Sequence, residues 1–217
     1  FSAPVLQRTN HRGATVPVAA GVLLVIATVA TEAILAVAES IGRDPGLGEA
    51  RGRTSVLIAA LGFGLLGVSD DLAAHGDDRG FKGHVTSLLR GRMTTGGLKL
   101  AGGGLLAIVV VHATGEDRLG PLVLGAAVVA LGANLGNLFD RAPGRTTKVA
   151  LLAGVALVIT SSPLDRPVLV GTVAVLGAGL GLLVPDLRES LMLGDAGANV
   201  LGAAVATGVV ATTGVTT

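Results

Sequence analysis

Seven apolar stretches, separated by short polar segments, dominate this sequence. Each is compatible with an α-helix, and several approach the roughly 20 residues that a helix needs to cross a bilayer. The stretches are Val16–Ala38, Thr54–Val68, Leu98–Ala113, Gly120–Leu138, Val149–Ser161, Val168–Val184 and Val200–Val215. Half of the 217 residues are hydrophobic and only 14% are charged, whereas soluble domains carry about 25% charged residues. The sequence therefore predicts an all-α fold, a polytopic transmembrane helix bundle with about seven spans.

The composition also bounds the domain organisation and the partners. We expect residues 1–217 to form a single integral-membrane domain in the cell membrane. Because the chain starts at Phe1 and ends in a semi-apolar run, we expect it to lack helices at one or both ends. A net charge of +1 argues against binding nucleic acid by phosphate neutralisation. The absence of cysteine excludes disulfides and thiolate metal sites.

The loops between the stretches differ in charge from one side to the other. One side would hold residues 1–15, 69–97, 139–148 and 185–199, and most of the 16 Lys and Arg residues lie in or beside these segments. The positive-inside rule predicts that this side faces the cytoplasm. Every unusual polar cluster of the sequence falls on the same side. We therefore expect one chemically active face, the cytoplasmic one.

Two adjacent carboxylates, Asp70 and Asp71, follow the second apolar stretch. They would stand at the C-terminal end of a helix, where the macrodipole disfavours anions, and each raises the cost of ionising the other. A site that breaks local rules in this way is a functional candidate, with a metal ion or a cation as the compensating charge. The alternative is a solvated helix exit.

Further polar residues lie at three other places on the predicted cytoplasmic side. Asn134, Asn137 and Asp140 are spaced by three and would line one helix face, with Arg145 nearby as a cation suited to phosphate; interhelical hydrogen bonding is the alternative for the amides. Asp195 lies between glycines just ahead of the last stretch, where simple helix capping would also explain it.

A basic, glycine-containing segment holds Lys82, His84 and Lys99. Attraction to anionic lipid explains such a segment equally well, and Lys99 could snorkel to the interface. Taken together, carboxylates and cations on one membrane face suit Mg²⁺-assisted chemistry on phosphates, since Mg²⁺ binds through one or two carboxylates plus phosphate oxygens. A substrate with a lipid tail and a phosphate head would place its reactive group at this depth.

Three motifs, in this order, resemble a known family. They are GVSDDLAAHGDDRGFKGHVTSLLRGRMTTGGLKL, ANLGNLFDRAPGRTTK and LMLGDAGANVLG, preceded by NHRGATVPVAAG. They are similar to motifs of the polyprenyl-phosphate N-acetylhexosamine-1-phosphate transferases, which include phospho-N-acetylmuramoyl-pentapeptide transferase. The resemblance runs from about Asn10 to Gly202.

The resemblance implies a reaction and a set of roles. A polyprenyl phosphate would attack the β-phosphate of a UDP-amino sugar, which gives a polyprenyl-diphospho-sugar and UMP with Mg²⁺ present. Asp70, Asp71 and Asp140 would be catalytic, with Asp140 and Asp71 at the metal. The substrates would be bound by Lys82, His84, Lys99, Asn134, Asn137, Arg145 and Asp195. The product would serve the synthesis of cell-wall or surface-glycan precursors, as in peptidoglycan.

The chain also departs from the family pattern. The usual Asp-Gly-x-Asp/Asn-Gly reads Asp140-Arg-Ala-Pro143-Gly144, so Pro143 replaces a polar residue. A non-catalytic relative that binds lipid phosphate or a partner therefore stays open as an alternative function. A third hypothesis is an ion-coupled transporter with Glu32, Asn134 and Asn137 as its pathway. The homodimer is likewise an open alternative to the monomer.

Overall fold

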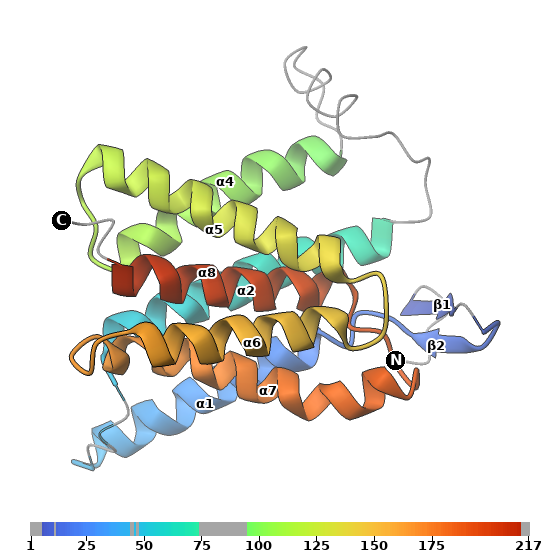
Figure 1. Ribbon diagram of the computed structural model, residues 1–217, viewed down its shortest axis with the longest axis horizontal. Coiled ribbons are helices and arrows are strands. Elements are labelled where there is room, and N and C mark those ends of the chain that lie inside the picture. Colours follow the sequence, from blue (N-terminus) through green and yellow to red (C-terminus); the bar gives the residue numbers. More distant parts are fainter. Residues whose placement is uncertain (1–5, 11, 44–45, 47, 74–94, 214–217) are drawn as a thin grey trace.

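The computed structural model describes residues 6–10, 12–43, 46, 48–73 and 95–213. These residues form a bundle of seven α-helices with a small hairpin at one end (Figure 1). The elements are β1 (Gln7–Thr9), β2 (Thr15–Pro17), α1 (Val22–Ser40), α2 (Ala50–Ala73), α4 (Thr95–Ala113), α5 (Leu119–Phe139), α6 (Arg145–Thr160), the 3-10 helix η2 (Arg166–Leu169), α7 (Val170–Leu187) and α8 (Gly194–Thr213). Each of the seven predicted apolar stretches overlaps one α-helix.

Five of these helices are long and apolar enough to cross a membrane, fewer than the seven spans predicted. The five candidate spans are Val22–Ser40, Ala50–Leu72, Leu119–Phe139, Arg166–Leu187 and Gly194–Thr213. Helix α6 has 16 residues, which rise about 24 Å, short of a hydrocarbon core of about 30 Å. The apolar part of α4 is the shorter segment Leu100–Ala113. The protein is thus an all-α, multi-pass membrane protein in which α6 and the apolar part of α4 are shorter than the five candidate spans.

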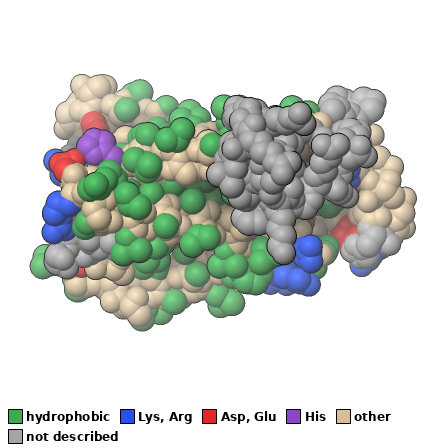
Figure 2. Space-filling view, turned by 90° about the horizontal axis from the view of Figure 1, so that it is seen from above, with side chains coloured by type: hydrophobic (Ala, Val, Ile, Leu, Met, Phe, Trp, Pro, Cys, Tyr) green, Lys and Arg blue, Asp and Glu red, His purple; other side chains and the backbone are tan. Residues whose placement is uncertain are grey.

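The surface agrees with this conclusion. Large hydrophobic side chains stand exposed along the helices, among them Ile34, Leu65, Leu131, Leu152 and Ile159. On the face shown in Figure 2, charged side chains gather toward the two ends, and hydrophobic side chains cover much of the length between them. An exterior of this kind is suited to lipid rather than to water.

Helix α8 lies at the centre of the bundle, between α2 and α5 (Figure 1). It is the most buried of the five candidate spans, with 67% of its apolar window inside the protein. Close backbone contact is possible because glycines meet at the crossings. A Cβ at Gly202 would overlap the backbone of Gly132 on α5, and a Cβ at Gly67 on α2 would overlap the backbone of Asp195. Small residues at helix crossings are typical of membrane bundles.

The first helix starts later than the sequence predicts. Val16 was expected to open it, but Thr15–Pro17 forms β2, which pairs antiparallel with β1, and α1 begins at Val22. The physical reason lies in the turn between them. Val16 and Val18 are buried on one side of an extended segment, and Ala19 then takes a positive φ of 61°, which no helix continues through.

The polar segments gather at one end of the bundle, as the alternation of the helices requires. The hairpin, the end of α2, the α5–α6 turn and the α7–α8 linker all lie at the right-hand end of Figure 1. That grouping agrees with the predicted grouping of loops. That this end faces the cytoplasm stays a prediction.

Candidate functional site

The N-terminus of α8 lies at this polar end of the bundle and binds carboxylates from neighbouring helices. The first N–H groups of a helix have no partner inside the helix, and they attract anions. Asp71, in the last turn of α2, supplies one: its Oδ1 accepts a hydrogen bond from the N–H of Asp195 at 3.1 Å, and its Oδ2 accepts one from the N–H of Ala196 at 3.1 Å. Asp71 is buried. It therefore caps α8 from a different helix.

Asp140 supplies a second carboxylate at the same place. It ends α5, where its backbone N–H donates to the carbonyl of Asn137 at 3.0 Å, and its carboxylate accepts a hydrogen bond from the backbone of Gly194. Three consecutive N–H groups, from Gly194 to Ala196, thus bind carboxylates of α2 and α5. Gly194 has a φ of 70°, and a Cβ there would lie 2.7 Å from Oδ2 of Asp71. The close approach of the Asp71 carboxylate to the start of α8 depends on this glycine.

The charge around Asp140 is strongly negative. Burial, followed by repulsion from Asp186, Asp195 and Asp71, raises the pKa of Asp140 from its ordinary 3.8 to about 7, and the Gly194 hydrogen bond opposes the rise. Asp195 lies in the first turn of α8. Carboxylates that repel one another in this way would gain stability from a bound cation.

This raised pKa has a consequence for stability. Between about pH 4 and pH 7, the Asp140 carboxyl is protonated in the folded protein but ionised in the unfolded chain. The free energy of unfolding therefore decreases as the pH rises through this range. Without divalent cations, the melting temperature is expected to fall as the pH rises from about 4 to 7, and Asp140→Asn is expected to flatten this fall. Thermal unfolding in detergent across the pH range checks it. Equal slopes in the two proteins would contradict the assignment.

A third carboxylate, Asp186, was not predicted from the sequence. It lies in the last turn of α7 and is buried, and its Oδ2 accepts a hydrogen bond from the N–H of Gly144 at 2.9 Å. Gly144 has a φ of 67° and is the N-cap residue just before α6. Asp186 thus fixes the α5–α6 turn that carries Asp140. The signal was available, because a carboxylate directly follows Pro185 at the end of an apolar stretch.

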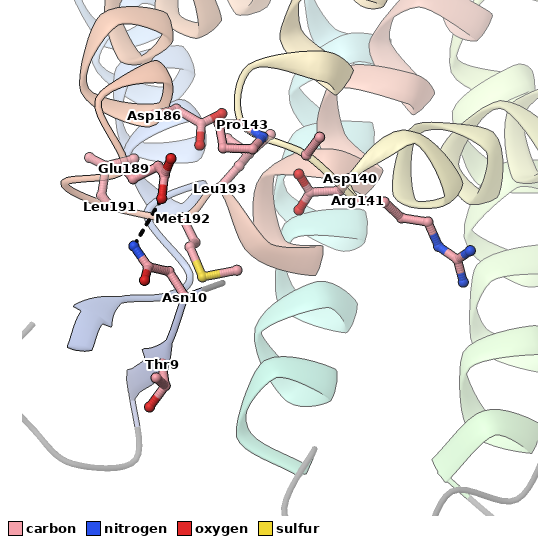
Figure 3. Close-up of a pocket in the computed structure, with 11 residues that line it drawn as sticks. Thr9, Asn10, Asp140, Arg141, Pro143, Asp186, Glu189, Leu191, Met192 and Leu193 are labelled. Atoms are coloured by element: carbon pink, nitrogen blue, oxygen red, sulfur yellow. Dashed lines mark hydrogen bonds between the residues drawn. The ribbon is translucent and has the colours of Figure 1, made fainter. Parts of the chain in front are cut away.

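A pocket of about 230 Å³ opens beside Asp140 (Figure 3). The hairpin, the α5–α6 turn and the end of α7 with the α7–α8 linker form its walls. Its lining comprises Thr9, Asn10, Asp140, Arg141, Ala142, Pro143, Asp186, Glu189, Leu191, Met192 and Leu193. Figure 3 shows Arg141 extending away from Glu189 and Asp186. The pocket can hold a small polar group next to the Asp140 carboxylate.

The predicted site residues are thus only partly brought together. Asp71, Asp140 and Asp195 meet at the start of α8, and Asp70 precedes Asp71 on α2, half-buried. Asn137 is half-buried one turn before Asp140, whereas Asn134 is exposed on α5.

For the cations predicted to bind the substrates, the structure gives less information. Arg145 is exposed in the first turn of α6. The backbone of Lys99 lies in α4, but its side chain, like Lys82 and His84, lies outside the described residues.

The donor set suits Mg²⁺, although it is not a complete metal site by itself. In the part of the chain that the structure describes, no three His, Asp or Glu side chains are arranged to hold a metal ion. Mg²⁺ commonly uses only one or two carboxylates and takes its other ligands from phosphate and water. Asp140, half-buried among repelling carboxylates, fits that role. Asp71 fits it less well, because both of its oxygens already accept N–H groups of α8.

A buried amide and a group of ion pairs lie outside this arrangement of carboxylates. Asn199, one turn after Asp195 on α8, is 2% exposed, and its amide has no hydrogen-bond partner among the described residues. At the opposite end of the bundle, Glu32 pairs with Arg53 at 3.3 Å, and Arg53 also pairs with Glu39 at 2.6 Å. These ion pairs join α1 to α2 and compensate the carboxylate that the transporter alternative would use.

No protein-family model matches this chain, and no curated protein matches it. Its function is therefore argued from the residues and their geometry.

Proposed function

We propose that this protein is a Mg²⁺-dependent phosphoglycosyl transferase, which moves a sugar-1-phosphate from a UDP-amino sugar to a polyprenyl phosphate. The observation that carries the proposal is the meeting of Asp71, Asp140 and Asp195, from three separate segments, at the start of α8 beside a pocket. The order and content of their motifs support it, because they resemble those of the polyprenyl-phosphate transferases.

The three aspartates differ in what they can do. Asp140 would hold Mg²⁺, with Asp195 beside it, and the bound ion would neutralise the diphosphate of the donor. Asp71 holds the start of α8 in place, so it orients Asp195 and, through Gly194, Asp140. The pocket would take the part of the donor that lies beyond its phosphates. Phosphoryl transfer needs mainly such positioning and charge neutralisation.

The acceptor side of the reaction fits the membrane fold. A polyprenyl tail would lie in the bilayer along the exposed apolar helix faces, with its phosphate at the polar end of the bundle. Asp70, half-buried on α2, is proposed to meet that phosphate and accept its remaining proton. An acceptor phosphate oxygen then bonds to the β-phosphorus of the donor, and the bond from this phosphorus to the bridging oxygen of UMP breaks.

Release of UMP tests the proposal. The protein in detergent, given undecaprenyl phosphate, Mg²⁺ and a panel of UDP-sugars, is expected to release UMP with at least one of them. Asp140→Asn is expected to lower kcat by at least about 100-fold, because it removes the charge that holds the metal. Asp117→Asn is the matched control, since Asp117 is an exposed carboxylate at the opposite end of the bundle.

Two results would contradict the proposal. One is the absence of UMP release with every donor from a well-folded protein. The other is an unaltered protein that binds undecaprenyl phosphate without turnover, and whose binding is the same after Asp140→Asn and Asp70→Asn; that result would identify a non-catalytic lipid-phosphate binder.

A further inference from the structure

Glu189, in the linker after α7, has a backbone conformation that side chains rarely adopt. Its φ is 55°, and its N–H donates to the carbonyl of Asp186 at 2.8 Å. Glycine usually occupies such a position after a helix, because it has no Cβ to clash. A glutamate in this strained backbone conformation suggests that its side chain has a functional role.

The Glu189 side chain reaches across to the N-terminal hairpin. Its Oε2 accepts a hydrogen bond from Nδ2 of Asn10 at 3.0 Å, drawn in Figure 3, and its Oε1 pairs with Nε of Arg12 at 2.9 Å. The Glu189 side chain is only 8% exposed, whereas that of Arg12 is 72% exposed. Asn10 and Glu189 both line the pocket beside Asp140. Their hydrogen bond therefore joins two walls of that pocket.

The Asn10 amide is oriented by the hairpin itself. Its Oδ1 accepts hydrogen bonds from the N–H groups of Arg12 and Ala14 at 3.0 and 2.9 Å. Because the oxygen is used inside the turn, the NH₂ group is the end that faces Glu189. One side chain thus shapes the hairpin tip and attaches it to the linker.

The base of the hairpin is fixed separately. Where the strand leaves toward α1, the N–H of Met192 donates to the carbonyl of Pro17 at 2.8 Å, and the N–H groups of Ala20 and Gly21 donate to Met192 and Leu193 at 3.1 and 2.9 Å. These backbone bonds do not involve the Asn10 or Glu189 side chains. The tip can therefore be released while the base stays in place.

We propose that Glu189 is a positioning residue that closes the pocket: through Asn10 and Arg12 it holds the hairpin tip over the pocket and so retains the part of the donor beyond its phosphates. This inference rests on the proposed function. It assigns to the hairpin the task of holding the substrate, while the chemistry stays at Asp140. Loss of the contact should therefore weaken donor binding and leave the chemical step intact.

Glu189→Gly separates this role from a purely structural one. Glycine relieves the backbone conformation, which offsets stability lost with the Asn10 and Arg12 contacts, so only a small change in melting temperature is expected. The KM for the UDP-sugar is expected to rise about tenfold, as for the loss of one charge-assisted hydrogen bond, with kcat within about twofold. Ala19→Gly is the matched control, because Ala19 also has a positive φ but does not line the pocket. An unchanged KM, or a fall in kcat at constant KM, would overturn the proposal.

Exchanging the acid and amide groups of Asn10 and Glu189 tests whether their contact can be restored. Asn10→Asp places a carboxylate against Glu189 and is expected to raise KM by at least tenfold, on the order expected for a lost hydrogen bond to a charged group. In the double variant Asn10→Asp with Glu189→Gln, the new aspartate still accepts the two backbone N–H groups, and the new glutamine amide donates to it. Most of the donor affinity is expected to return. A double variant no better than Asn10→Asp alone would contradict the pairing.

Spin labels test the contact without relying on turnover. The chain contains no cysteine, so Ala14→Cys and Arg188→Cys, both at exposed positions, would carry the only labels. One narrow distance distribution is expected, and it should broaden when Glu189→Gly is added. A distribution that stays narrow would overturn the closing role. A protein with this broadening but no UMP release would instead count against the transferase function.

Discussion

Asp71→Ala is expected to lower the free energy of unfolding by about 2–4 kcal/mol, since it removes a helix cap and two hydrogen bonds to a carboxylate. The loss leaves the N–H groups of Asp195 and Ala196 in a buried place without an acceptor. UMP release should fall as well, because α8 would no longer hold Asp195 and Gly194 in register with Asp140. Thermal unfolding in detergent and the UMP assay measure the two effects.

The neighbouring carboxylate gives the matched comparison. Asp71→Asn keeps one acceptor oxygen, so a smaller loss of stability is expected than for alanine. Asp70→Ala, at a half-buried position one residue earlier, leaves both Asp71 hydrogen bonds to α8 in place and should therefore destabilise the protein less than Asp71→Ala does, even though the proposed reaction needs Asp70. Equal destabilisation by Asp70→Ala and Asp71→Ala would show that capping of α8 is not what Asp71 contributes.

Gly67→Ala is expected to have the second large effect. A methyl group there would overlap the carbonyl of Asp195, so α2 and α8 would have to move apart where the site is built. Overpacking of this kind costs about 1–3 kcal/mol, and the displaced Asp195 should reduce UMP release out of proportion to the lost stability. Unfolding curves and initial rates on the same samples check this.

Gly104→Ala is the control for that substitution. Gly104 lies in α4 with nothing within 4 Å of its would-be Cβ. Alanine is the better helix former by up to about 1 kcal/mol, so this variant should be as stable as the parent or more so, with normal turnover. A Gly67→Ala protein that behaved like Gly104→Ala would show that the α2–α8 crossing tolerates a side chain.

The helices were predictable from the sequence because burial in lipid leaves a strong signal. Every apolar stretch became a helix, although polar residues extended several of them. Helix α8 starts at Gly194 rather than Val200 and so includes Asp195, and α6 starts at Arg145 rather than Val149. Apolarity marks where a helix meets lipid or core, not where its hydrogen bonds begin. The alternation of the helices alone places Asp71, Asp140 and Asp195 at the same end of the bundle.

Contacts between distant polar residues were not predictable in the same way. Asp186 and Glu189 act through Gly144 and Asn10, partners that lie 42 and 179 residues away along the chain. The hairpin was missed because β2 is three residues long and its Val16 continues an apolar run. No periodicity marks so short a strand.

The tight packing of α8 limits which parts of the protein can respond to a ligand. Backbone meets backbone where α8 crosses α2 and α5, at Gly67 and at the Gly132–Gly202 contact, so the helix can neither slide nor rotate without collision. The aspartates held at the start of α8 therefore keep fixed positions relative to one another. The α5–α6 turn is held by Asp186, so any opening, closing or adjustment to ligands of different size has to come from the hairpin tip. If the proposed transferase function holds, related proteins would accommodate different donors by changes in the hairpin tip, while the aspartates at the start of α8 keep their places.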